Sequence, residues 1–155
     1  MKTVWPPATN GTAVARTVLT RLGVPMADVR LYDGSGLSRS NRIPARTLTG
    51  ALRAAALPTN PQLHSVYGAT ALPVAGMTGT LRAARGRFTT APSRCARGKL
   101  AAKTGTLRDV VTLAGVTTGA DGRQHFFAFM VNGRASTLTT KRAVDGLAAT
   151  VTGCW

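Results

Sequence analysis

The feature that most constrains the fold is a set of three apolar segments in the second half of the chain. They span 100–104, 110–117 and 124–131, and residues 119–122 (Gly-Ala-Asp-Gly) supply a tight turn between the last two. In the third segment, apolar side chains fall on both alternating sets of positions: Phe126, Phe127, Phe129 and Met130. Strands that are apolar on both sides are typical of a sheet covered on both faces. We therefore expect three consecutive antiparallel strands.

Helical periodicity flanks these strands. Apolar residues recur at helical spacing over 12–22, between Pro44 and Pro58, and over 140–152, which predicts three helices. The last helix has an apolar face at Val144, Leu147, Ala148 and Val151, and we expect this helix to pack on the sheet. The whole pattern predicts one α+β domain with no linker between two units.

The other segments are rich in Pro, Gly and small polar residues and are expected to be less regular. We expect a disordered lead-in at 1–11, a short strand at 29–32, a tight loop at 33–41, loop with helical turns at 58–80, a short basic helix at 79–85 and an exposed loop at 86–98.

The composition fits a single packed domain with a strongly basic surface. The chain has 155 residues, 44% of them hydrophobic, and 20 Lys+Arg against 5 Asp+Glu give a net charge of +15. Such a charge favours anionic polymers, nucleic acid or acidic surfaces, although an Ala- and Arg-rich composition gives the same excess without any such role. Aromatic residues are only 5% and no nucleic-acid reader motif occurs, so nucleic acid is not an expected partner.

No apolar run approaches the roughly 20 residues that span a bilayer, and Met1 to Pro7 lacks the apolar core of a signal peptide. Cys95 and Cys154 do not have metal-ligand spacing, so they form either one disulfide or two buried thiols. His64 and His125 have no matching partners and are interpreted as structural. We expect no metal and no cofactor.

A candidate binding site lies at Lys103-Thr104-Gly105-Thr106, where an apolar run leads into a lysine, two hydroxyls and a glycine. The ammonium attracts a carboxylate, the hydroxyls donate to it, and the glycine lets a ligand approach the backbone. A lysine at this position is also common as the solvated end of a strand, so the motif alone leaves both interpretations open.

Further stretches occur in an order that resembles one family. They are 33–39 (Asp-Gly-Ser-Gly-Leu-Ser-Arg), 72–76 (Leu-Pro-Val-Ala-Gly) with 79–81 (Gly-Thr-Leu), 102–107 (Ala-Lys-Thr-Gly-Thr-Leu), 113–116 (Leu-Ala-Gly-Val) and 127–129 (Phe-Ala-Phe). Together they resemble the C-terminal part of the D-alanyl-D-alanine carboxypeptidase/endopeptidase family, the class C low-molecular-mass penicillin-binding proteins. The resemblance covers about Asn10 to the C-terminus. It implies that residues 1–155 are the C-terminal portion of a penicillin-binding domain, with an antiparallel sheet flanked by helices.

The activity implied by the resemblance is cleavage of peptidoglycan stem peptides by acyl transfer through a serine ester. The implied partners are stem peptides and β-lactams, and the implied location is extracytoplasmic, where a Cys95–Cys154 bridge can persist. The family uses Ser-x-x-Lys, Ser-x-Asn and Lys-Thr-Gly motifs, but no serine here has a lysine three residues later and no Ser-x-Asn occurs. The simplest account is a fragment that lacks the N-terminal part of the domain; a diverged, non-catalytic relative is the other.

The resemblance also implies roles for single residues. Lys103 would bind or polarise the substrate carboxylate, Thr104 and Thr106 would hydrogen-bond to it, and the Thr106 N–H would supply one oxyanion-hole donor. Gly105 would allow the ligand's close approach. The residues expected to line the same cleft are Ser35, Leu37 and Arg39. Arg39 either meets an acidic group of the stem peptide or is a solvated loop arginine. Arg108 follows Thr106-Leu107, where the family often has a small residue, so a different pocket shape is expected there. The alternative function is a non-catalytic basic module that binds an anionic polymer of the cell wall, or nucleic acid.

Overall fold

The computed structural model describes residues 8–68 and 71–154, and its centre is a three-stranded sheet. Strands β1 (Leu100–Leu107), β2 (Val110–Thr118) and β3 (Gln124–Asn132) are consecutive antiparallel neighbours in the order β1-β2-β3. The predicted strands and the α+β class are therefore confirmed. Strand β1 continues beyond the expected residue 104 to Leu107, so that Thr104, Gly105 and Thr106 lie within a strand.

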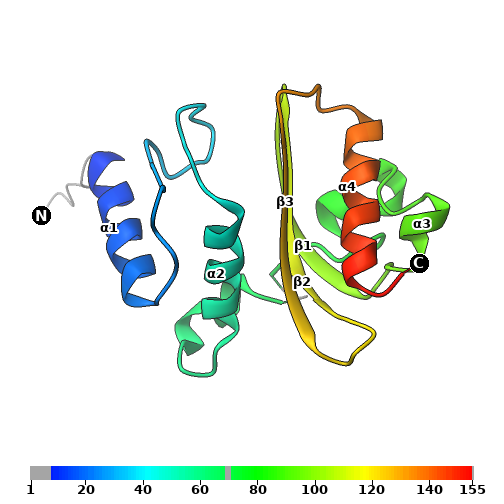
Figure 1. Ribbon diagram of the computed structural model, residues 1–155, viewed down its shortest axis with the longest axis horizontal. Helices are drawn as coiled ribbons and strands as arrows, with labels where there is room; N and C mark the ends of the chain where they lie inside the picture. The colour runs from blue at the N-terminus through cyan, green and yellow to red at the C-terminus, as the bar shows by residue number, and fades with distance from the viewer. Residues whose placement is uncertain (1–7, 69–70, 155) are drawn as a thin grey trace, which may run out of the picture.

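Helices cover both faces of this sheet (Figure 1). On one face lies α2 (Ala45–Ala56), and on the other lie α3 (Ala91–Arg94) and α4 (Leu138–Val151). The alternating side chains of the strands divide accordingly. Ala101 and Val116 belong to a small apolar cluster with Leu72, whereas the larger core contains the following buried residues: Leu100, Ala102, Val111, Leu113, Phe127, Val144, Ala148 and Ala149.

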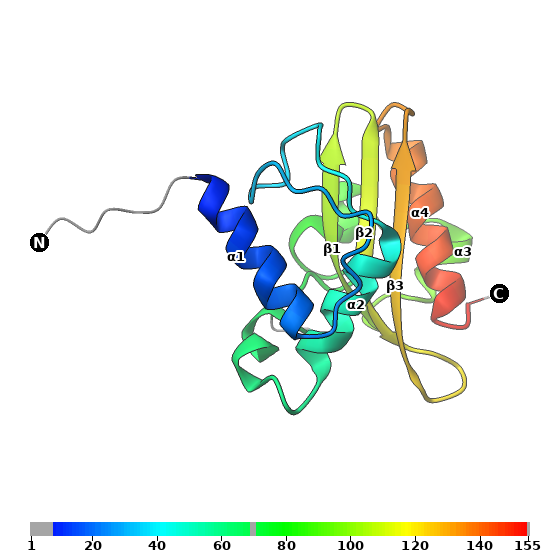
Figure 2. The same cartoon turned by 60° about the vertical axis from the view of Figure 1, so that its left-hand side comes forward.

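Helix α1 (Ala8–Arg21) lies outside α2, away from the sheet (Figures 1 and 2). Two residues of its apolar stripe, Val14 and Val18, are 60% and 43% exposed. The side chain of Arg16 donates to the carbonyl of Val29 at 2.5 Å, which ties the helix to the chain that follows it.

The segment between the layers is more ordered than the sequence suggested. It contains three 3-10 helices, which are η1 (Pro61–Val66), η2 (Gly79–Leu81) and η3 (Ala83–Arg85). Helix α3 follows them. The single helix expected at 79–85 is wrong because Arg82 between η2 and η3 has extended backbone, with ψ 145°. The exposed loop expected at 86–98 is also wrong, since Phe88, Ser93 and Ala96 are fully buried.

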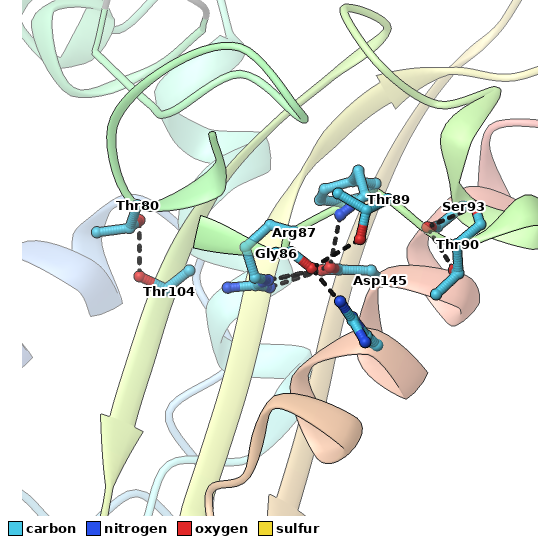
Figure 3. Close-up of polar contacts among 10 residues, drawn as sticks. Thr80, Gly86, Arg87, Thr89, Thr90, Ser93, Thr104 and Asp145 are labelled. Carbon is cyan, nitrogen blue, oxygen red and sulfur yellow. Dashed lines mark hydrogen bonds and ion pairs between the residues drawn. The ribbon is translucent and has the colours of Figure 1, made fainter. Parts of the chain in front are cut away.

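Two cross-links fasten this segment to α4. Cys95 and Cys154 form a disulfide with a Cα–Cα distance of 6.1 Å. The buried Arg87 guanidinium donates to both carboxylate oxygens of Asp145, at distances from 2.6 to 3.1 Å (Figure 3). The backbone N–H of Phe88 donates to Oδ2 of Asp145 at 3.0 Å. The Asp145 side chain has no exposed surface, and that of Arg87 is 6% exposed. Of the two states left open for these cysteines, the structure has the disulfide, and a buried ion pair joins the same segment to α4.

Other differences from expectation are local. Helix α1 begins at Ala8, so the lead-in expected at 1–11 is wrong for residues 8–11, and residues 1–7 lie outside the described part of the chain. The strand expected at 29–32 is reduced to one bridge between Arg30 and Arg42, which closes the loop between them. On α4, Leu147 is 48% exposed, and Ala149 takes its expected place in the core.

Candidate functional site

The backbone pairing on the outer edge of strand β1 ends just before Lys103. The first half of the strand pairs on the outer side with the segment before η2: the N–H of Ala75 donates to Leu100 O at 3.0 Å, and the N–H of Ala102 donates to Pro73 O at 2.9 Å. Backbone groups of successive strand residues point to alternate sides. The N–H and C=O groups of Thr104 and Thr106 therefore point to this same outer edge, beyond the end of the pairing.

The polar side chains of β1 meet at this outer edge. The ammonium of Lys103 is exposed and donates to the carbonyl of Thr104 at 2.8 Å. The hydroxyl of Thr104 lies 2.9 Å from that of Thr80 on η2, and either oxygen can donate (Figure 3). The edge thus combines a cation, two paired hydroxyls and an outward N–H at Thr106. These are the groups that hold a carboxylate or a developing oxyanion.

Gly105 leaves space for a side chain of the neighbouring strand. It pairs with Thr112 on β2, and a Cβ added at Gly105 would collide with the Thr112 hydroxyl. A side chain at this position would therefore require the Thr112 hydroxyl to rotate or the two strands to shift. Gly115, which pairs with Ala102, has a similar restriction, because a Cβ there would collide with the Ala101 carbonyl and the Ala102 methyl group.

The loop at 33–41 is organised around the carboxylate of Asp33. This carboxylate accepts hydrogen bonds from the Ser35 hydroxyl, from the Asn41 amide at 2.6 Å, and from the backbone N–H groups of Leu37 and Ser38 at 3.2 Å each. Because these donors stabilise the charged form, with the Ser35 and Asn41 side chains contributing most, the pKa of Asp33 falls from 3.8 to about 2.

Arg39 links this loop to the end of β1. Its guanidinium donates to both carboxylate oxygens of Asp109, in the turn between β1 and β2, at 2.8 and 2.7 Å. The hydrogen bond from Arg39 lowers the pKa of Asp109 and in turn raises that of Arg39. The loop is thereby attached three residues beyond Thr106.

The structure brings together Lys103, Thr104, Gly105 and Thr106 and joins Arg39 to the turn next to them. The hydrogen bonds of Ser35 and of the Leu37 backbone lie within the loop, and the Leu37 side chain is 67% exposed. Sequence reasoning missed two partners. Thr80 lies in a stretch that was recognised, Gly79-Thr80-Leu81, but its spacing does not reveal the contact with Thr104. Asp109 stood out only as one of five acidic residues in a basic chain.

Two hollows on the surface lie elsewhere. One of about 500 Å³ lies between the end of α1, α2 and Phe126, with Arg46 and Arg53 in its lining. The other, of about 260 Å³, adjoins the start of β1 and includes Tyr67, whose pKa is raised by burial. Within residues 8–68 and 71–154 no group of three or more His, Cys, Asp or Glu side chains is placed to hold a metal ion. No helix in the same part of the chain is long and apolar enough to cross a membrane.

Comparison with known proteins gives concordant matches. The model of the D-Ala-D-Ala carboxypeptidase 3 (S13) family matches residues 4–152. The chain is 39% identical over 138 residues to carboxypeptidase DacB of Mycolicibacterium smegmatis, covering 89% of this chain and 29% of that protein. It is 33% identical over 123 residues to D-alanyl-D-alanine carboxypeptidase DacB of Haemophilus influenzae, covering 79% of this chain and 24% of that protein.

Among solved structures, penicillin binding protein 4 of Haemophilus influenzae is similar, with a TM-score of 0.71 and 28% identity over 90% of this chain. A second structure of that protein, in complex with a β-lactam, gives a TM-score of 0.70. The chain spans 31% and 32% of these two structures, so the matched relatives are about three to four times longer than the region that resembles this chain.

Proposed function

Since the chain belongs to the D-Ala-D-Ala carboxypeptidase 3 (S13) family, we propose that it supplies the carboxylate-binding edge of a serine-type D-alanyl-D-alanine carboxypeptidase/endopeptidase. The substrate class is the peptidoglycan stem peptide, and the reaction is acyl transfer. The observation that carries the proposal is the open outer edge of β1, where the Lys103 ammonium and the outward N–H of Thr106 lie beyond the last backbone pairing at Ala102.

Each group on this edge has a defined task. The Lys103 ammonium, now bonded to the Thr104 carbonyl at 2.8 Å, is exposed and turns to the terminal carboxylate of the substrate. The Thr104 hydroxyl donates its one proton to that carboxylate and accepts a hydrogen bond from the Thr80 hydroxyl. The Thr106 hydroxyl is a second donor to the carboxylate, and the outward backbone N–H of Thr106 is one donor of the oxyanion hole.

The nucleophile is proposed to lie outside these 155 residues. Acyl transfer needs a hydroxyl with a base beside it, and no serine of this chain is followed three residues later by a lysine. The serine, its lysine and the second oxyanion donor would come from another part of the same protein, consistent with the chain's 29% share of a related carboxypeptidase.

Arg39 is proposed as a positioning residue. Its two terminal nitrogens each donate to Asp109, so it holds the loop at 33–41 next to the end of β1, where the exposed Leu37 and the Ser35 segment form one wall of the cleft. We place the protein outside the cytoplasm, because peptidoglycan is found there and a disulfide such as Cys95–Cys154 persists under oxidising conditions.

The test is a nuclear magnetic resonance titration of the labelled chain with an acylated D-Ala-D-Ala peptide and with the same peptide ending in a carboxamide. The free-acid peptide should shift the amide signals of Thr104, Gly105 and Thr106, and the carboxamide should not. Lys103→Met should abolish the shifts, whereas Lys141→Met, which removes a lysine of α4, should leave them unchanged. Equal shifts from both peptides, or full retention in Lys103→Met, would show that this edge does not bind a carboxylate.

A further inference from the structure

Four guanidinium groups converge on the short segment from Gly86 to Thr89. Arg142 donates to Gly86 O at 3.2 Å, Arg97 donates to Phe88 O at 2.8 Å, and Arg94 donates to Thr89 O at 3.0 Å. The fourth belongs to Arg87 within the segment, and it is buried against Asp145. Arg82 and Arg85 are exposed at the two ends of η3, immediately before Gly86.

We call the five outer arginines the basic face; they are Arg82, Arg85, Arg94, Arg97 and Arg142. The first four are exposed, and Arg142 is half-buried. The hydrogen bonds of Arg82, Arg94, Arg97 and Arg142 go to backbone carbonyl groups. A carbonyl orients a guanidinium without cancelling its charge, and each guanidinium has five N–H donors. These side chains are therefore held in place while further donors remain for a ligand.

No carboxylate side chain neutralises the basic face. The chain has five acidic residues, all aspartates. Four are engaged elsewhere: Asp28 with Arg46, Asp33 within its loop, Asp109 with Arg39 and Asp121 with His125. The fifth, Asp145, has no exposed surface and is already paired with Arg87. Among the residues that the structure describes, the five guanidinium charges of the basic face therefore have no carboxylate side chain paired with them.

We propose that the basic face binds a linear polyanion of the cell envelope through its repeating phosphodiester or carboxylate groups. Planar guanidinium groups match both kinds of anion with paired hydrogen bonds. A row of such groups also attracts a charged polymer over a distance and gains affinity from the release of its counterions. Because Thr80 and Arg82 are two residues apart, the bound polymer would pass close to the open edge of β1.

The disulfide favours an envelope polymer over nucleic acid as the partner of the basic face. Cys95 lies between Arg94 and Arg97 in sequence and is bridged to Cys154 at the end of α4. Structural disulfides form and persist in oxidising surroundings such as the outside of the cell, and the anionic polymers found there are envelope components. Binding of this surface also does not require the carboxylate-binding edge, so the two proposals fail independently.

The experiment compares the 155-residue chain with two variants of equal charge. In the basic-face variant, four arginines become glutamine: Arg82, Arg85, Arg94 and Arg97. In the matched control, four exposed arginines from other surfaces become glutamine: Arg21, Arg30, Arg53 and Arg123. The probes are inorganic polyphosphate, polygalacturonate and a single-stranded oligodeoxynucleotide, and affinity is measured at several salt concentrations. A third variant, Arg82→Gln with Arg85→Gln, tests the surface without touching the bonds of Arg94 and Arg97.

We expect polyphosphate or polygalacturonate to bind, and whichever binds more tightly identifies the anion. The basic-face variant should bind at least roughly 10-fold more weakly than the control variant, and the logarithm of its affinity should depend less steeply on salt. The double variant should lie between them, and circular dichroism should show an unchanged fold. Equal weakening in the two quadruple variants, or no binding to either polymer, would overturn the proposal. Tighter binding of the oligodeoxynucleotide through the same arginines would overturn it in favour of nucleic acid.

Discussion

Two bidentate Arg–Asp pairs in this chain share their chemistry and differ in their surroundings. Arg87–Asp145 has side-chain exposures of 6% and 0%, whereas Arg39–Asp109 has 63% and 34%. Asp145→Asn preserves the shape of the buried side chain and removes its charge. Because the Arg87 guanidinium would remain charged and buried without a counter-ion, the free energy of unfolding should fall by about 3–5 kcal/mol.

This loss is large for a chain of 155 residues, since such domains are stable by about 5–15 kcal/mol. With a denaturant slope of roughly 2–6 kcal/mol per molar guanidinium chloride, the unfolding midpoint should move by about 1 M. The matched control is Asp109→Asn. Water and salt screen that exposed pair, so its midpoint should stay close to that of the unmodified chain.

The assay is equilibrium unfolding in guanidinium chloride, followed by circular dichroism and tryptophan fluorescence. A third variant replaces both buried partners with apolar residues, Arg87→Met with Asp145→Leu. It should recover most of the stability lost in Asp145→Asn, because replacing a buried pair by apolar groups of similar volume is often neutral or stabilising. Similar midpoints for Asp145→Asn and Asp109→Asn would refute the argument that burial determines the cost of removing one charge.

Three further predictions address the disulfide, the loop and the missing nucleophile. Replacing Cys95 and Cys154 with serine should lower the free energy of unfolding by about 4 kcal/mol, as the loop-entropy model gives for a sequence separation of 59; unfolding of the oxidised chain with and without reductant checks the same value. The pKa of Asp33 is about 2 in the folded chain against 3.8 ordinarily, so its stabilisation of the loop is present above about pH 4 and lost as the pH falls through 2. Carboxyl carbon signals recorded against pH test this, and a titration of Asp33 near its ordinary value would contradict it. The chain should not be acylated by a fluorescent penicillin, since no serine has a lysine three residues later; intact mass after incubation checks this, and a stoichiometric adduct would mean that a nucleophile has been missed.

Periodicity predicted the sheet and the three longer helices well because these features are local. The strands over 110–118 and 124–132 are joined by a short Gly-containing turn, and their pairing follows from neighbouring residues alone. The end of β1 at Leu107 was missed because Gly105, a poor strand residue, follows the predicted strand end at Thr104. The pairing of residues 105–107 of β1 with residues 110–112 of β2 overrides that weak propensity.

The least predictable part is the segment at 79–98. Its composition is that of a solvated basic loop, yet Phe88 and Ser93 are fully buried and Arg87 is almost so. What holds the segment in place is far away in sequence, namely Asp145 and Cys154 on or next to α4. Contacts over such separations leave no periodic signal. The candidate site shows the same division: its Lys103-Thr104-Gly105-Thr106 motif could be recognised in the sequence, but the contacts of Thr80 and Asp109 could not.

The double attachment of this segment to α4 also sets an order of events during synthesis. Arg87 precedes Asp145 by 58 residues and Cys95 precedes Cys154 by 59. At about 5–20 residues per second, a nascent chain therefore presents the Arg87 guanidinium and the Cys95 thiol without their partners for roughly 3–12 s. Because the 155 residues contain only these two cysteines, the thiol has no wrong partner within them. Under oxidising conditions, the error open to an unpaired Cys95 thiol is a bridge between two chains.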